Sequence, residues 1–336
     1  MQQNIQYCTA PDGVRLAYAT LGNGPKLVRT PHWFSHLEHD LDSQVMRHTI
    51  LALAHHHTVL RYDARGIGMS QREGAEISFD KLVQDLETVV DAAKFDRFIL
   101  FGLSQGCAQA IAYAARHPDR VSHLILYGGF ARGMLRRNNP EKQTQALELA
   151  RGLVRAGWGS HEESHRQFFT SQFIPDGTAD DYHSLNEMQR VATTPEIAEQ
   201  FLITNSTIDV VALLPQVKAP TLVLHSKHET RVPFELGQEM AAGIPGAKFV
   251  PLESRNHLIL AHEPAHRTMA DAIADFLGEK RIRGHLPGTA GISERLESGI
   301  SKVERSWLIK VVIIFAALTG CVLFFMEMWK LVKGGH

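Results

Sequence analysis

The sequence predicts a layered α/β domain, and three observations support that class. Strand-like and helix-like patterns alternate over about 275 residues, as expected when helices cover a mostly parallel sheet. Several short apolar runs are unbroken, which is typical of parallel strands buried on both faces. The chain of 336 residues is also long enough for one large domain with an insertion, because most single domains are shorter.

The predicted strands are short runs rich in β-branched and apolar residues. In chain order, they are residues 14–20, 26–30, 58–63, 97–101, 123–127, 220–226 and 248–252. Helical patterns lie between most of these runs. Residues 79–93 place Leu82, Leu86 and Val89 on one helix face, and residues 264–277 show the same periodicity.

Residues 132–215 break this alternation. They are polar, helical in pattern and without a strand-like run, so we expect a helical cap inserted between two strands of the sheet. Cap and sheet together give one domain over residues 1–278. No internal repeat or low-complexity tract divides it further.

The C-terminal segment 307–329, WLIKVVIIFAALTGCVLFFMEMW, predicts a transmembrane helix. Its charges, Lys310 and Glu327, lie near the ends and can reach the headgroups, and tryptophans bound it as interfacial anchors. A buried core helix or an oligomerisation helix is the alternative. Residues 279–306 are predicted to be the linker that precedes this helix.

We expect the helix to anchor the protein in a membrane with its folded domain in the cytoplasm. The N-terminal sequence MQQNIQYCTAPDG shows no secretory signal. Basic residues are also somewhat more frequent on the N-terminal side of the span: Arg295, Lys302 and Arg305 precede it and Lys310 lies near its start, while Lys330 and Lys333 follow it.

Charge and cysteine content exclude several classes of protein. Lys plus Arg number 35 and Asp plus Glu 36, which gives a net charge of -1, and no basic stripe predicts binding to nucleic acid. Cys8, Cys107 and Cys321 are far apart and odd in number, so they form neither a disulfide framework nor paired metal knuckles.

The strongest local signal is the sequence FILFGLSQGCAQAIAYAARHP. A buried strand runs into Gly102-Leu103-Ser104-Gln105-Gly106 and then directly into an alanine-rich helix, which is the context of a nucleophile elbow. Glycines are needed where neighbouring side chains would collide with the strained turn, and the helix N-terminus offers amides to a developing oxyanion. Ser104 is therefore the candidate nucleophile, and a plain glycine-rich turn is the alternative.

A serine hydroxyl needs a base to take its proton and a carboxylate to orient that base. His257 follows the strand-like sequence KFVPLES, and Glu229 follows the strand-like sequence PTLVLHS. Asp209, late in the cap, is a weaker candidate for the acid. The order Ser104, Glu229, His257 along the chain is the order of serine, acid and histidine in α/β hydrolases.

Taken together, these residues resemble an α/β-hydrolase-fold protein over residues 5–278. Residues 61–70, RYDARGIGMS, resemble the family's YDxRGxGxS turn, and residues 225–233 resemble the stretch that presents the acid. The resemblance implies a mostly parallel sheet flanked by helices, with a helical cap insertion. It also implies a catalytic triad of Ser104, Glu229 and His257.

Two departures from the family pattern affect the expected site. Pro31-His32-Trp33-Phe34 stands where most members have His-Gly, so the second oxyanion donor is assigned to the backbone amide of Trp33. The first donor is the amide of Gln105. The acid is glutamate where aspartate is commoner, and its extra methylene requires a slightly different loop path.

The 19 histidines do not predict a metal site. His36-Leu37-Glu38-His39 lacks the spacing of a helical zinc site. We expect His55, His56 and His57 to be solvated, and His32 and His36 either to line the mouth of a pocket or to be structural. Cys107 is expected to be a small packing residue rather than a second nucleophile.

The predicted function is a serine hydrolase that cleaves a carboxylic ester, thioester or lactone through an acyl-enzyme. No cofactor is implied. Serine at the elbow argues against haloalkane dehalogenase or epoxide hydrolase chemistry, which needs a carboxylate nucleophile, while metal-free perhydrolase activity uses the same triad. The alternative is a hydrolase-fold module that senses a small molecule and signals through a membrane partner. The segments YCTAPDGVRLAYATLG and HWFSHLEHDLDSQVMRH resemble such modules.

Overall fold

The computed structural model describes residues 3–160 and 162–289. The predicted transmembrane helix 307–329 and the linker from residue 290 onward lie outside the described residues. Within the described part of the chain, no helix is both long enough and apolar enough to cross a membrane. Internal contacts divide the chain into two units, residues 1–288 and 289–336, and the first unit contains the sheet and the candidate active site.

The first unit is built on an eight-stranded sheet with strand order β1-β2-β4-β3-β5-β6-β7-β8. The first two strands pair antiparallel, β2 pairs antiparallel with β4, and all other neighbours are parallel. The strands are β1 (Asn4–Thr9), β2 (Arg15–Leu21), β3 (Lys26–Arg29), β4 (Thr58–Tyr62), β5 (Phe98–Leu103), β6 (Val121–Tyr127), β7 (Thr221–Ser226) and β8 (Lys248–Leu252).

The prediction of a mostly parallel sheet is confirmed. Central strands β5 and β7 are buried along their whole length, which explains their unbroken apolar sequences. The edge strand β1 was not predicted, because most of its residues are exposed and its sequence therefore lacks an apolar run or a clear alternation.

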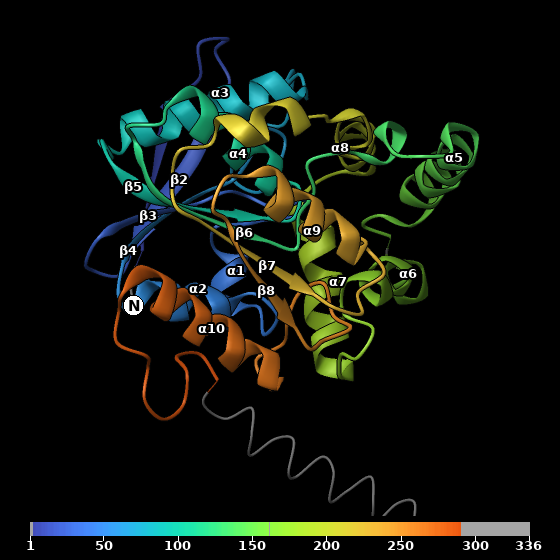
Figure 1. Cartoon of the computed structure of the whole chain (residues 1–336). Helices are drawn as coiled ribbons and strands as arrows, with labels where there is room; N and C mark the ends of the chain where they lie inside the picture. Colours follow the sequence, from blue (N-terminus) through green and yellow to red (C-terminus); the bar gives the residue numbers. More distant parts are fainter. Residues whose placement is uncertain (1–2, 161, 290–336) are drawn as a thin grey trace, which may run out of the picture. The chain divides into compact units, whose positions relative to one another are not determined.

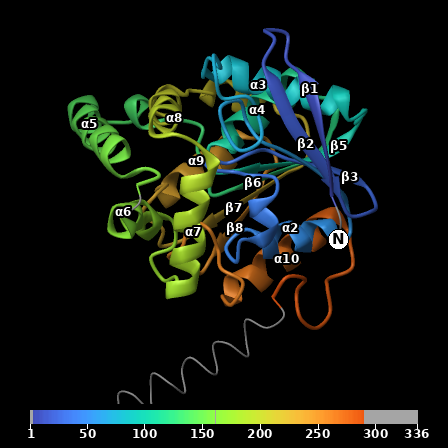
Figure 2. The ribbon, with the colours of Figure 1, turned by 180° about the vertical axis from the view of Figure 1, so that it is seen from behind.

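Helices cover both faces of the sheet (Figure 1). One apolar cluster contains residues of α3, α4 and α9, and another contains residues of α2 and α10; Figure 2 shows the same two layers from behind. These helices, with the short α1, are α1 (His39–Asp42), α2 (Arg47–Ala54), α3 (Phe79–Ala92), α4 (Gly106–Arg116), α9 (Phe234–Gly243) and α10 (Pro264–Leu277).

The predicted helices 79–93 and 264–277 correspond to α3 and α10. The side chains of Leu82, Leu86 and Val89 are fully buried along one face of α3, as their spacing of three and four residues requires. Helix α10 begins with Pro264, which suits the first helical turn, and ends at Gly278 with a left-handed backbone.

Along the chain, a group of helices is inserted between β6 and β7. These helices lie to one side of the sheet in both views (Figures 1 and 2). Local sequence explains where several of them begin: Thr178 and Asp181 form a reciprocal capping box, and the side chains of Asn139 and Thr194 also accept backbone hydrogen bonds. The helices are η1 (Met134–Arg136), α5 (Pro140–Gly157), α6 (Glu163–Phe173), α7 (Ala179–Ala192), α8 (Pro195–Thr207) and η2 (Val211–Gln216).

The first unit extends to residue 288 rather than to the predicted 278. Arg267 of α10 donates hydrogen bonds to the backbone carbonyls of Ile282 and Gly284, and the side chain of Leu286 is buried. A buried apolar side chain and paired carbonyls fix this segment to the domain. This extension was not predicted, because residues 279–288 are mostly polar and lack periodicity.

One expectation about the histidines is wrong. His57 is buried rather than solvated. Its Nδ1 lies 2.9 Å from the carbonyl oxygen of Leu53 at the end of α2, and its Nε2 lies 2.8 Å from a carboxylate oxygen of Glu279. The side chain is thus a link between α2 and the segment that follows α10.

A buried histidine pair between α2 and α10 predicts loss of stability in acid. The rings of His48 and His266 meet edge to face, 4.5 Å apart. Burial lowers the pKa of His48 to about 4 and that of His266 to about 3. Both histidines are therefore neutral in the folded state, and unfolding takes up protons as the pH falls below the unfolded pKa of about 6.5.

We expect His266→Phe, which keeps a buried ring and removes the titration, to flatten this dependence. Between pH 7.5 and pH 5 the wild-type protein should lose about 1 to 2 kcal/mol more unfolding free energy than the variant does. Urea unfolding at the two pH values measures the difference. The exposed His183 supplies the control: His183→Phe should follow the wild type, and parallel losses in all three proteins would contradict the prediction.

Candidate active site

Ser104, the predicted nucleophile, lies on the sharp turn between β5 and α4. Its φ of 53° is left-handed, which is rare for a residue with a side chain. Strand β5 ends at Leu103 and helix α4 begins at Gly106. The turn therefore leaves Ser104 partly exposed at the carboxyl edge of the sheet, where ligands of open α/β sheets bind.

The two glycines of the motif are required by close packing. A β-carbon on Gly102 would lie 2.8 Å from Cα of Cys107, and one on Gly106 would lie 2.1 Å from Oγ1 of Thr30. Neither space admits a side chain unless the backbone or Thr30 moves. The motif thus serves to bring α4 close against β5 and the segment after β3.

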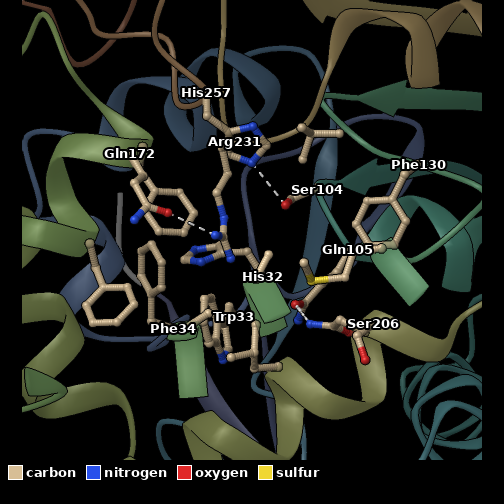
Figure 3. Close-up of a pocket in the computed structure, with 18 of the residues that line it drawn as sticks. His32, Trp33, Phe34, Ser104, Gln105, Phe130, Gln172, Ser206, Arg231 and His257 are labelled. Carbon is tan, nitrogen blue, oxygen red and sulfur yellow. Dashed lines mark hydrogen bonds between the residues drawn. The ribbon is translucent and has the colours of Figure 1, made fainter. Parts of the chain in front are cut away.

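His257 and Glu229 lie next to Ser104. Nε2 of His257 is 3.0 Å from Oγ of Ser104, and Nδ1 is 2.5 Å from Oε2 of Glu229. Both His257 and Glu229 have fully buried side chains. Because a carboxylate only accepts, Nδ1 carries the proton and Nε2 is left with a lone pair toward the serine hydroxyl. Figure 3 shows the contact between Ser104 and His257.

A second histidine, not foreseen as a site residue, holds the carboxylate from its other side. Nε2 of His225, at the end of β7, is 2.9 Å from Oε1 of Glu229 and 2.9 Å from the carbonyl oxygen of Val232. Both neighbours are acceptors, so Nε2 carries the proton. Burial raises the pKa of Glu229, but the neighbouring His257 and the hydrogen bonds from His225 and His257 outweigh it and hold the pKa below its ordinary value.

We expect His225→Leu to weaken catalysis through Glu229. Loss of a donor to a buried carboxylate corresponds to about a 10- to 100-fold drop in turnover. The pKa of Glu229 should rise, so the acid limb of the pH profile of kcat/KM should move to higher pH. The remote, partly exposed His117 gives the control His117→Leu. An unchanged pH profile in His225→Leu would show that His225 only packs.

The loop that carries His257 is fixed from both sides. Tyr127 of β6 donates a hydrogen bond of 2.7 Å to the carbonyl oxygen of His257 and accepts one of 3.0 Å from the amide of Ile259. The amide of His257 donates to the carbonyl oxygen of Phe173 at the end of α6, at 2.8 Å. The imidazole is therefore held by the sheet and by the inserted helices together.

The predicted oxyanion donors, the amides of Gln105 and Trp33, lie in the turns that follow β5 and β3. Neither amide donates a hydrogen bond to another described residue. The side chains of both residues contact α8: Nε1 of Trp33 donates to the carbonyl oxygen of Ala198 at 3.1 Å, and Oε1 of Gln105 accepts from Asn205. These contacts fix the two turns and leave their amides free.

The turn at residues 61–70 supports the segment after β3. Oδ2 of Asp63 accepts hydrogen bonds from the amides of Leu37 and Met69, at 3.1 and 2.9 Å. A β-carbon on Gly68 would lie 2.2 Å from that same carboxylate oxygen, which explains the glycine. The motif therefore has a structural role: it holds the segment that contains Trp33.

Ser104 opens into a cavity of about 320 Å³ between the sheet and the inserted helices. Aromatic and aliphatic side chains form most of the wall (Figure 3). The charged side chains that line it are Arg137 and Arg231, and none of the described Asp or Glu residues does so. A cavity of this size suits a small organic molecule.

The structure separates other candidates from this cavity. Oδ1 of Asp209 accepts from the amide of Val211 and has no contact with His257. His32 lines the cavity, but His36 is not among the lining residues. Burial, reinforced by Arg29, lowers the pKa of His32 far below its ordinary value, so it is neutral.

Among the described residues, Cys107 is not a second nucleophile and the histidines do not form a metal site. Burial raises the pKa of the Cys107 thiol, and its Sγ donates to the carbonyl oxygen of Gly102; it packs beneath the elbow, as expected. No group of three or more His, Cys, Asp or Glu side chains in the described part of the chain is placed to hold a metal ion.

The fold and the arrangement of these residues define an α/β hydrolase. The model of the alpha/beta hydrolase fold family matches residues 37–264, and the chain belongs to this family. Hydrolase chemistry is therefore the general class of its activity.

Curated relatives have related activities. The chain is 28% identical over 258 residues to pyrrolizixenacetamide deacetylase of Xenorhabdus hominickii, covering 74% of this chain and 90% of that protein. It is 27% identical over 214 residues to pimeloyl-[acyl-carrier protein] methyl ester esterase of Neisseria meningitidis, covering 60% and 67%.

Solved structures support the same fold. A hydrolase from Pseudomonas aeruginosa superposes with a TM-score of 0.68 at 23% identity, over 82% of this chain and 98% of that chain. An enol-lactonase from Burkholderia xenovorans superposes with a TM-score of 0.65 at 24% identity, over 82% and 100%.

Proposed function

We propose that this protein is a serine hydrolase that cleaves a carboxylic ester, thioester or lactone through an acyl-enzyme. The observation that carries the proposal is the continuous contact from Oγ of Ser104 through His257 to Glu229, at 3.0 and 2.5 Å. Relatives named as a methyl ester esterase and a deacetylase support acyl transfer as the chemistry.

In this mechanism, Nε2 of His257 takes the proton of Ser104 as its Oγ attacks the substrate carbonyl carbon. Glu229 holds Nδ1–H and stabilises the imidazolium that forms. The amides of Gln105 and Trp33 donate to the oxyanion. His257 then gives its proton to the leaving alcohol or thiol, and the same steps with water release the acid and restore Ser104.

A small-molecule sensor built on the same fold is the competing function. A sensor needs the cavity but not a base within hydrogen-bond distance of a serine, nor a buried carboxylate behind that base. Burying Glu229 costs free energy unless its charge is used or compensated. The arrangement of the three side chains therefore favours the enzyme.

The decisive experiment is covalent labelling with a fluorophosphonate, followed by a panel of esters of increasing acyl length. We expect stoichiometric labelling at Ser104 and turnover of at least one ester class. Purified, folded protein that takes up no label and hydrolyses no ester, thioester or lactone would favour the sensor.

The membrane anchor is a second part of the proposal and rests on the apolar sequence 307–329. A cytoplasmic hydrolase domain on such an anchor would meet lipidic or membrane-partitioned substrates. We expect residues 1–288 alone to be soluble and labelled by fluorophosphonate, and the full chain to stay in the membrane pellet through a carbonate wash. Full-length protein in the supernatant without detergent would overturn the anchor, and digestion of the hydrolase domain by protease added outside intact cells would overturn the orientation.

A further inference from the structure

Arg231 is a cation in the cavity that has no carboxylate partner among the described residues. It lies two residues after Glu229 in the loop that follows β7, and its guanidinium contacts two aromatic rings. Cζ of Arg231 is 5.3 Å from the ring centroid of Trp33 and 5.1 Å from that of Phe173. Figure 3 shows the side chain within the cavity, with its hydrogen bond to Gln172.

One donor of this guanidinium is occupied, and the remaining donors are unused. Nη1 donates to Oε1 of Gln172 at 3.0 Å. Among the described residues, no other acceptor and no carboxylate within 4 Å meets Arg231. Glu229 is the acidic residue nearest to Arg231 in the sequence, but its carboxylate oxygens face His257, His225 and the amide of Val232.

Arg231 stays charged at neutral pH, so the cavity is positive. Burial lowers the pKa of Arg231 to about 10 in spite of the opposing effect of Glu229. Arg137, the other charged side chain of the wall, lies over the ring of Phe130 and donates to a backbone carbonyl oxygen, again without a carboxylate partner among the described residues. Two half-buried cations without a carboxylate partner among the described residues favour a ligand that brings negative charge.

We propose that Arg231 binds a carboxylate of the substrate, so that this enzyme acts on esters or lactones of molecules that also carry a free carboxylate. The inference rests on the proposed serine hydrolase function and adds the charge of its substrate. The rings of Trp33 and Phe173, whose centroids are 6.5 Å apart, contact the guanidinium, and its in-plane N–H groups match the two oxygens of a planar carboxylate. The second cation, Arg137, makes the cavity more favourable for the same charge.

The test compares substrates of equal length that differ in charge. The probes are 4-nitrophenyl hydrogen adipate, its neutral primary amide and 4-nitrophenyl hexanoate. With the full chain in detergent, kcat/KM for the adipate should exceed that for the amide at least about tenfold, mainly through KM, as expected for a charge-assisted contact. Equal kcat/KM values for adipate and amide would overturn the proposal.

Variants assign the preference to Arg231. Arg231→Gln should lower kcat/KM for the adipate about 10- to 100-fold and that for the amide by a much smaller factor, while Arg231→Lys should retain part of the preference. The surface variant Arg116→Gln is the matched control. Equal losses on all three esters in Arg231→Gln would mean that Arg231 only positions the wall of the cavity.

Binding without turnover separates this proposal from the proposed function. Calorimetry with free adipate should show binding to the wild type and none to Arg231→Gln, whether or not any ester is hydrolysed. Missing fluorophosphonate labelling with intact adipate binding would overturn the hydrolase function alone. Intact labelling without adipate binding would overturn the carboxylate site. If the protein bound inorganic phosphate but not adipate, the proposed carboxylate ligand would be wrong and Arg231 would instead be a phosphate site.

Discussion

Replacing Ser104 with alanine is expected to abolish fluorophosphonate labelling and to lower ester turnover by about 10³- to 10⁶-fold. The reason is chemical rather than structural, because alanine removes the oxygen that lies 3.0 Å from Nε2 of His257 and leaves the backbone turn occupied by a residue with the same Cβ. The measurements are kcat on the best ester and intact-mass analysis of the labelled protein.

Ser206 provides the matched serine for this experiment. It lines the same cavity, but its hydroxyl donates to the carbonyl oxygen of Ile203 rather than facing His257. Ser206→Ala should keep its labelling, and both variants should unfold at the same temperature as the wild type within a few degrees. Wild-type turnover in Ser104→Ala would show that another group is the nucleophile.

Replacing Glu229 with glutamine is expected to lower turnover by about 10³- to 10⁴-fold while the fold is kept. Glutamine has the same size, but it carries no charge to stabilise the imidazolium, and its amide can present a donor to Nδ1 and favour the wrong tautomer of His257. The loss should appear in kcat, because the contact matters most when the imidazole is charged.

Asp209 tests whether the acid is correctly assigned. Asp209→Asn makes the same chemical change at a residue that bonds the amide of Val211 and forms an isolated bridge with Arg132. Its turnover should stay within about twofold of the wild type, since substitutions at the surface, away from the contacts of Ser104, His257 and Glu229, have small effects. A larger loss in Asp209→Asn than in Glu229→Gln would move the acid to Asp209.

Local patterns predicted most of the sheet because the buried parallel strands have sequences that few other structures accommodate. Runs such as residues 97–101 and 220–226 are apolar on both faces, and helix α3 shows its buried stripe at a spacing of three and four residues. Strand β1 escaped prediction because an exposed edge strand needs no apolar pattern. Its position is set by backbone hydrogen bonds to β2, which any sequence can make.

The candidate triad was predictable for a different reason. A strained turn between a buried strand and a helix accepts only a narrow set of residues, so the motif of Gly102, Ser104 and Gly106 can be recognised in the sequence. Glu229 and His257 follow strands that end at the same edge of the sheet. Their order and position after those strands therefore predicted that they lie near Ser104. His225 was not foreseen, because a histidine within a buried strand shows no local sign of the carboxylate that it meets.

Contacts between chain neighbours and the common edge of a parallel sheet therefore made four features predictable: the α/β class, the parallel strands, the elbow and the residues proposed for acyl transfer. The charge of the cavity and the surroundings of the acid depend instead on long-range packing. Arg231 contacts Trp33 and Phe173, residues about 200 and 60 positions away, and long-range packing of that kind leaves no periodic signal. Whether a polar side chain is paired or free depends on such contacts, and so the case for a carboxylate-bearing substrate comes from the folded molecule.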